Sequence, residues 1–263
     1  REICSIWARK TMRCASNWGD PMRLDVSVYT NRGGREINED SVRWGVRDGS
    51  GFFTVADGLG GCGSGEVSSD LAAHALLKAW EDNSVKPQER AAWLEEAIRA
   101  ADRLLVGEQK RRGSGMKTTV AALSIDGAHA AWAHVGDTRV YRLTDGRIER
   151  LTCDHSVSYK KYQSGEISRN GVNFDEDRPS LLRVLGDPKG CRPESGSLEA
   201  ILPGDAFLLC SDGFWEYLYD EELLIDFLQS DTPGQWAERM LVRALPRFRP
   251  GHDNLTLLAV FTG

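Results

Sequence analysis

The hydrophobic and polar positions follow two different periods along the chain, and their order predicts the layout of the fold. From Leu24 to Thr30, apolar and polar residues alternate with a period of two, which is typical of a half-buried strand. Ser41–Val46 and Gly51–Ala56 are strand-like on either side of an Asp-Gly-Ser-Gly turn and predict a β-hairpin. Apolar residues then keep helical spacing from Leu71 to Trp80 and from Leu94 to Leu105. Two amphipathic helices are therefore expected directly after the hairpin.

Strand patterns return in the middle of the chain and at its end. We expect strands at Thr118–Ile125, His129–Val135, Arg139–Leu143, Ile148–Leu151, Ser197–Leu202, Ala206–Cys210 and Leu255–Phe261, and two late helices at Glu221–Gln229 and Pro233–Leu245. This grouping is not the strict alternation of strands and helices that builds a parallel sheet. It favours an α+β fold in which two mostly antiparallel sheets are covered by helices on both sides.

One large domain is predicted from residue 22 to residue 263. The chain has 263 residues, of which 41% are hydrophobic and 27% charged, so it has enough apolar material for a substantial core. Residues 1–21 lack both periodicity and the apolar segment of a secretory signal, and we interpret them as a poorly ordered tail, with a native start near Met22 as one interpretation. The polar stretch at about 156–180 is too long for an ordinary connection and predicts a mobile surface flap.

Charge and cysteine content exclude several classes of function. The formal net charge of −6 disfavours nucleic acid as a partner, because such binders usually carry a cationic surface. Apolar stretches are far shorter than the ~20 residues that span a bilayer, so no membrane association is expected. The six cysteines have no C-x-x-C spacing and are interpreted as reduced thiols of a cytoplasmic protein. No heptad pattern indicates assembly, and we expect a monomer.

Acidic residues recur at the ends of predicted strands, usually followed by a turn-forming residue. These acids are Asp57, Asp137, Asp212 and Asp253, together with the pair Glu39 and Asp40. An Asp-Gly pair taken alone is explained by turn formation. Five such groups instead favour a cluster of oxygen ligands of the kind that Mg²⁺ and Mn²⁺ prefer. The glycine-rich run after Asp57 lacks both the GK[ST] ending and the G-x-G-x-x-G spacing of nucleotide-binding loops.

These motifs occur in an order that resembles the PPM family, the metal-dependent type-2C protein serine/threonine phosphatases, in particular the compact bacterial members. The resemblance covers residues 24–262. It rests on Arg35-Glu36-Ile37-Asn38-Glu39-Asp40, Ala56-Asp57-Gly58-Leu59-Gly60-Gly61, Lys117-Thr118-Thr119, Val135-Gly136-Asp137-Thr138-Arg139, Leu151-Thr152-Cys153-Asp154-His155-Ser156, Leu182-Arg183-Val184-Leu185-Gly186, Cys210-Ser211-Asp212-Gly213 and His252-Asp253-Asn254. Each piece is a weak signal, whereas the full order is highly specific.

The resemblance implies a four-layer αββα sandwich with a pair of Mn²⁺ or Mg²⁺ ions at one rim. By position, Asp57 would bridge both ions, Asp212 and Asp253 would complete one site, and the carbonyl of Gly58 would serve the other. A metal-activated water would then hydrolyse phosphoserine and phosphothreonine in proteins without a phosphoenzyme. None of the six cysteines lies in the Cys-x5-Arg loop of a cysteine phosphatase, which is consistent with this expectation.

Other residues match the periphery of the same site. Glu39 and Asp40 would bind through waters held by the metals, and Asp137, with help from Asp212, matches a third and weaker metal site. Arg35 matches the arginine that binds the substrate phosphate, a role that suits the planar guanidinium. The implied partners are phosphorylated proteins and a cognate bacterial serine/threonine kinase.

One position departs from the family pattern. Cys62 stands where the family commonly has a histidine that protonates the leaving group, and a thiol with a reference pKa near 8.5 is a different acid. This leaves open a second hypothesis, a catalytically weak or inactive phosphoprotein-binding domain of the same fold. A third is a phosphatase for small-molecule phosphates, for which a closed pocket would be expected.

Overall fold

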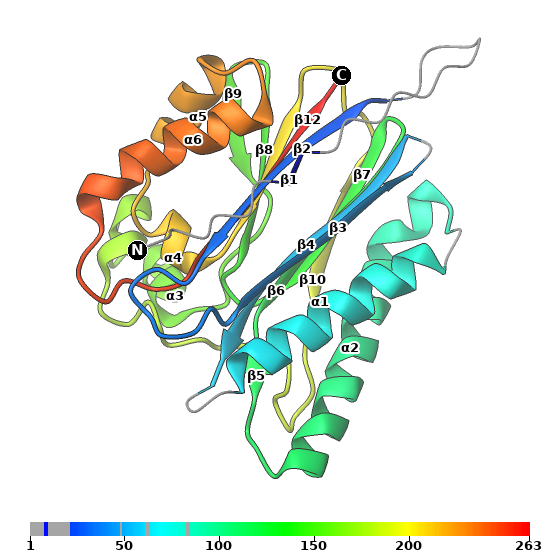
Figure 1. Ribbon diagram of the computed structural model, residues 1–263, viewed down its shortest axis with the longest axis vertical. Helices are drawn as coiled ribbons and strands as arrows, with labels where there is room; N and C mark the ends of the chain where they lie inside the picture. The colour runs from blue at the N-terminus through cyan, green and yellow to red at the C-terminus, as the bar shows by residue number, and fades with distance from the viewer. Residues whose placement is uncertain (1–7, 10–21, 48, 61–63, 83–84) are drawn as a thin grey trace.

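Two antiparallel sheets form the centre of the computed structural model, which describes residues 8–9, 22–47, 49–60, 64–82 and 85–263 (Figure 1). Sheet I has the strand order β1 (Ala8–Arg9), β2 (Leu24–Asn31), β12 (Leu255–Thr262), β11 (Ala206–Cys210), β8 (Arg139–Thr144) and β9 (Arg147–Arg150). Sheet II has the order β10 (Glu194–Leu198), β7 (His129–Val135), β6 (Val120–Asp126), β4 (Ser50–Leu59) and β3 (Asp40–Arg47), with β5 (Lys117–Thr118) paired to the end of β4.

Helices cover the outer face of each sheet. The long helices α1 (Gly65–Glu81) and α2 (Arg90–Arg112) lie on sheet II, and α5 (Asp220–Leu228) and α6 (Pro233–Ala244) lie on sheet I, as Figure 1 shows. Shorter elements are α3 (Val157–Ser164), α4 (Asp212–Trp215) and the 3-10 helices η1 (Pro87–Glu89), η2 (Arg169–Phe174) and η3 (Leu245–Arg247). The predicted α+β sandwich with helices on both sides is confirmed. Among the helices in the described part of the chain, none combines the length and apolar character needed to cross a membrane.

The strand alternation divides the core into three layers. Leu257 and Leu258 are neighbours on β12 and are both fully buried, but their side chains leave opposite faces of the sheet. Leu257 packs with Trp236 of α6 beneath the helices, whereas Leu258 packs with Phe53 of β4 between the two sheets. A third cluster fills the space between sheet II and helices α1 and α2. Both sheets are thus locked together by side chains of alternate strand positions.

The structure differs from the sequence prediction in several places. The expected flap contains regular structure, because Ser156 caps α3 by accepting a hydrogen bond from the Tyr159 N–H and Gly165 ends it with φ 81°. Helix α4 lies where the sequence analysis predicted no helix. Strand β10 begins before the predicted Ser197–Leu202 strand and ends at Leu198. Of the predicted tail, the structure describes only Ala8 and Arg9, which pair with Val28 and Ser27 of β2.

Candidate metal and phosphate site

The predicted acids gather around one cavity of about 590 Å³, where ends of both sheets meet. Sheet II supplies Asp57 from the end of β4, sheet I supplies Asp253 just before β12, and Asp212 begins α4 directly after β11. Asp137 lies in the turn between β7 and β8. Arg35, Glu39 and Gly58 also line the cavity, whereas Asp40 lies behind it as a buried residue. Residues up to 218 positions apart in sequence therefore share one site.

The register of the β3–β4 hairpin sets two of these acids side by side. Asp40 is paired directly with Asp57 across the two strands. The next residue, Gly58, approaches the backbone of Gly65 so closely that a Cβ atom would lie 2.1 Å from the Gly65 carbonyl oxygen. Only glycine fits there without displacing the start of α1. The strand end is thus fixed against the helix that follows the glycine-rich loop.

Two polar side chains hold the acidic residues in place, and the sequence analysis assigned a role to neither. The Asn254 side chain accepts a hydrogen bond from the Glu39 N–H at 2.7 Å and donates to the carbonyls of Arg32 and Ile37, both at 2.9 Å. Asn254 therefore anchors the loop that carries Arg35 and Glu39. Ser211 donates to the carboxylate of Asp40 at 2.7 Å. Both residues directly adjoin a predicted ligand and lie within the quoted motifs, which are the signals that could have indicated them.

Burial and mutual repulsion make the ionised form of these acids unfavourable. Burial raises the pKa of Asp57 well above its usual value, and the charges of Asp40, Asp212, Asp137 and Asp253 raise it further. The pKa of Asp40 rises to about 7, again mainly through burial. Its Oδ1 atom is buried without a hydrogen-bond partner among the residues that the structure describes. Bound cations are the usual compensation for such a group of buried carboxylates.

Comparison with known proteins identifies this arrangement. The family model described as Protein phosphatase 2C matches residues 30–241. The chain belongs to the protein phosphatase 2C family. Serine/threonine phosphatase stp of Listeria monocytogenes is 31% identical over 90% of this chain and 95% of its own length. The crystal structure of the Mycobacterium tuberculosis serine/threonine phosphatase PstP has a TM-score of 0.80 and 31% identity, covering 90% of this chain and 98% of that one. The predicted enzyme class, a protein serine/threonine phosphatase, is thereby confirmed.

A second solved structure similar to this chain is the catalytic domain of the serine/threonine protein phosphatase PstP in complex with 2 manganese ions. It has a TM-score of 0.79 and 30% identity, and the match covers 92% of this chain and 99% of that one. The family therefore includes a member of the same fold, similar over nearly its whole length, that holds a manganese pair.

A buried ion pair supports the site of this phosphatase from behind. Arg139 of β8 binds the carboxylate of Asp154 with an Nη2 to Oδ2 distance of 2.6 Å, and both side chains are almost fully buried. Burial alone would raise the pKa of Asp154, but the charge of Arg139 holds it below its usual value. The guanidinium lies over the Trp215 ring, 3.4 Å from its centroid, and the Trp215 indole N–H donates to the Asp137 carbonyl at 2.9 Å. The network thus reaches both Asp137 and helix α4, which begins with Asp212.

Two arginines border the cavity of the phosphatase. Arg35 has a 55% exposed side chain and binds the Asp253 carboxylate at 2.8 Å, so its guanidinium lies at the mouth. Arg178 comes from the expected flap, where the sequence analysis identified no site residue, and lies 3.9 Å from the Asp212 carboxylate. It also forms an ion pair with Glu216. Asp212 therefore faces an arginine from a segment 34 residues earlier in the chain.

The leaving-group acid is not identified by the described residues, and the nearby histidine of the Asp154-His155-Ser156 motif does not line the cavity. Cys62 lies outside the described residues. His155 stacks on His134 with ring centroids 4.5 Å apart, and its Nδ1 accepts a hydrogen bond from the Gly136 N–H at 3.1 Å. Burial lowers the pKa of His155 to about 4, so its ring is neutral at pH 7. The other ring nitrogen, Nε2, lies 3.1 Å from the Arg183 guanidinium and 3.4 Å from the Glu194 carboxylate, and the positive charge of Arg183 disfavours a cation there.

Proposed function

We propose that the acid-lined cavity is the active site where this chain hydrolyses phosphoserine and phosphothreonine in proteins with a pair of Mn²⁺ or Mg²⁺ ions. The observation that carries the proposal is the convergence of Asp57, Asp137, Asp212 and Asp253 on one cavity, with Asp40 directly behind. Burial and mutual repulsion raise the pKa values of Asp57, Asp137 and Asp212, and two divalent cations would relieve that repulsion.

The residues fit a metal pair in number and in kind. Asp57 would bridge the two ions, Asp212 and Asp253 would complete one site, and the Gly58 carbonyl would serve the other, since all four residues line the cavity. Hard cations take such carboxylate and carbonyl oxygens together with water.

A second group of acids lies farther from the proposed pair. Glu39 lines the cavity, and Asp40 offers its unpartnered Oδ1 from behind, so both are placed to accept hydrogen bonds from waters on the ions. Asp137, close enough to Asp212 for its charge to raise the Asp137 pKa, is the candidate for a third and weaker site. When bound, divalent cations lower the pKa of water and offset the negative charge of a phosphoryl group.

Arg35 is proposed to bind the substrate phosphate. Its guanidinium is at the mouth of the cavity and is paired only with Asp253 among the described residues. A substrate phosphate could accept bidentate hydrogen bonds from the same planar group. A cysteine nucleophile is disfavoured, because Cys153, Cys191 and Cys210, the cysteines that the structure describes, do not line the cavity. Burial also raises the pKa of Cys191 to about 12.

The substrates are proposed to be phosphoproteins produced by a cognate serine/threonine kinase, and the phosphatase is proposed to act as a monomer. The family relationship supports phosphoproteins as the substrates, since the relatives named above are serine/threonine phosphatases.

The test is phosphate release from a phosphothreonine peptide with Mn²⁺, with Mg²⁺ and with chelator. Wild type should release phosphate only with metal, and Asp57→Asn should lose this activity by about 10³-fold or more, because a neutral amide is a poor bridging ligand. Cys62→Ser in the same assay tests the thiol as the leaving-group acid, for which a fall of roughly 10²-fold is expected. If wild type is inert with every metal yet binds the phosphopeptide, the protein is a binding domain and the proposal fails.

A further inference from the structure

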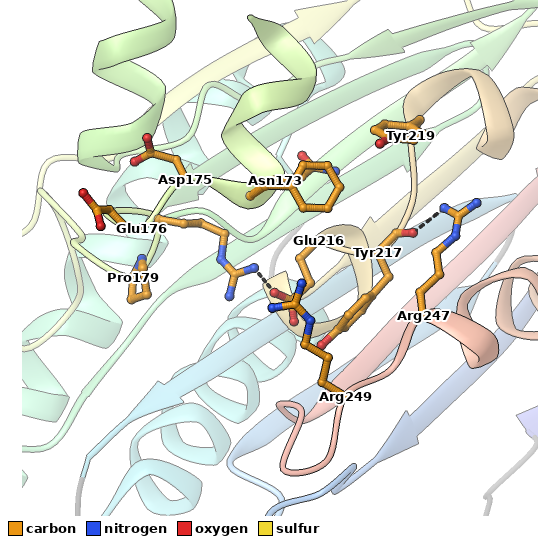
Figure 2. A pocket seen from close by; sticks show the side chains of 11 residues that line it. Asn173, Asp175, Glu176, Pro179, Glu216, Tyr217, Tyr219, Arg247 and Arg249 are labelled. Carbon is orange, nitrogen blue, oxygen red and sulfur yellow. Dashed lines mark hydrogen bonds and ion pairs between the residues drawn. The ribbon is translucent and has the colours of Figure 1, made fainter. Parts of the chain in front are cut away.

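A second cavity of about 550 Å³ lies directly beside the acid-lined one. It is bounded by the end of η2, by the connection between α4 and α5, and by the segment after η3 (Figure 2). Pro179 lines both cavities, and its neighbour Arg178 lines the second cavity while its guanidinium lies 3.9 Å from Asp212. A chain bound with one residue in the acid-lined cavity can therefore continue over Arg178 and Pro179 into the second.

The walls of this cavity are aromatic and preformed. Phe174 is 64% exposed, and its ring makes an edge contact with Tyr219 at a centroid distance of 6.1 Å. The preceding residue, Asn173, is buried and donates to the carbonyls of Trp215 and Leu218 at 3.2 and 3.0 Å, which fixes this segment on the body of the protein. When a partner covers an exposed phenylalanine ring on a fixed backbone, the buried apolar surface contributes favourable free energy to binding.

One cation in the cavity is available to a ligand. Arg178 and Arg247 are each bound to a glutamate of the chain itself. Arg249 is exposed, and its guanidinium makes no hydrogen bond or ion pair with any residue that the structure describes. Figure 2 shows Arg249 beside Tyr217 and Glu216, with Glu176 at the opposite end of the cavity. The charge available to a ligand at the Arg249 end of the cavity is therefore positive.

We propose that this aromatic–arginine pocket, formed by Phe174, Tyr217, Tyr219 and Arg249, binds the stretch of substrate protein that flanks the phosphorylated residue. An acidic group of that stretch, either a carboxylate or a second phosphate, faces Arg249, and an apolar side chain covers Phe174. The inference rests on the proposed function, because only a phosphorylated residue held in the acid-lined cavity positions its neighbours here. Such a pocket makes the phosphatase selective among phosphoproteins.

The test compares wild type with Arg249→Gln on phosphothreonine peptides that carry Asp or Asn at one flanking position at a time. At the best position, wild type should prefer Asp by about 2- to 5-fold in kcat/KM, the size expected for one exposed ion pair. In Arg249→Gln this ratio should fall to about 1, and Arg249→Glu should prefer Lys at the same position. A second phosphothreonine in place of Asp distinguishes the two acidic groups, since its larger charge should widen the preference.

Controls separate the pocket from the chemistry. p-Nitrophenyl phosphate is too small to reach the pocket, so Arg249→Gln and Phe174→Ala should hydrolyse it within about 2-fold of wild type. The matched variant Arg111→Gln removes an exposed arginine from the end of α2 and should leave the Asp preference unchanged. An equal Asp-to-Asn ratio in wild type and Arg249→Gln, or no preference at any flanking position in wild type, would overturn the inference. A wild type that fails to hydrolyse p-nitrophenyl phosphate with metal overturns the proposed function, and this inference with it.

Discussion

Asp57 shows how a carboxylate that is suited to bind a cation destabilises the folded protein when no cation is bound. Its pKa is raised by burial and by the surrounding carboxylates, so the ionised form is less favourable in the folded, metal-free protein than in the unfolded chain. Asp57→Asn supplies a neutral side chain of the same shape. In excess chelator at pH 7.5, we expect this variant to raise the free energy of unfolding by about 1–3 kcal/mol. Urea unfolding followed by tryptophan fluorescence measures the difference.

Saturating Mn²⁺ should reverse the order, because wild type gains binding free energy that the variant lacks. Asp145→Asn is the matched control, since Asp145 lies in the exposed turn between β8 and β9 and not at the cavity. Asp145→Asn should change the free energy of unfolding by no more than about 0.5 kcal/mol, either in chelator or in Mn²⁺. A variant Asp57→Asn less stable than wild type in chelator would contradict the repulsion described above.

The elements differ in how far the sequence alone predicts them, and the reason is length and context. Helices α1 and α2 bury one face over several turns, so their apolar spacing is readable. Helix α3 has eight residues and buries only Ser158 and Tyr159, so its period is too short to recognise, although Ser156 and Gly165 are ordinary capping signals.

The residues of the candidate site also differ in how far the sequence alone predicts them. Each acid stands beside a turn-forming residue at a strand end, which made the group recognisable from local sequence. The positions of Asn254 and Arg178 depend on contacts with residues 215 and 34 positions away, so only packing reveals them. The group of acids was predictable from local sequence, whereas the contacts of Asn254 and Arg178 were not.

Helix α4 links the buried ion pair of β8 to the acids of the cavity, and Asp154→Asn tests this link. Arg139 would keep its charge without a carboxylate partner, and breaking a buried pair in this way costs about 3–5 kcal/mol in free energy of unfolding. We also expect slower phosphate release, because Trp215 between Arg139 and the Asp137 carbonyl would lose its fixed position. Urea unfolding and steady-state kinetics on the phosphothreonine peptide check both effects.

The double variant Arg139→Met, Asp154→Leu is the control for this prediction. It removes both members of the pair and leaves only Arg150, 3.7 Å from Asp154, without that carboxylate, so it should recover part of the lost stability. Phosphate release would remain impaired if the guanidinium over Trp215 positions the indole. Stability of Asp154→Asn within about 0.5 kcal/mol of wild type would show that the pair is dispensable.

The molecule as a whole places its proposed active site across the junction of two sheets. Asp40 and Asp57 belong to sheet II, whereas Asp212 and Asp253 adjoin strands of sheet I. No single sheet holds a complete set of proposed ligands. Metal affinity should therefore depend on how firmly the sheets pack against each other, in addition to the identity of the ligands.

Leu257 and Leu258 separate this dependence from general stability, because they are equally buried neighbours on opposite faces of β12. Each leucine-to-alanine change should lower the free energy of unfolding by about 2–5 kcal/mol through the cavity it creates. Leu258→Ala, which loosens the packing between the sheets, should weaken Mn²⁺ binding roughly 3- to 10-fold by isothermal titration calorimetry, and Leu257→Ala less than about 2-fold. Equal losses of Mn²⁺ affinity in the two variants would mean that the site is rigid within each sheet end and does not rely on the packing between the sheets.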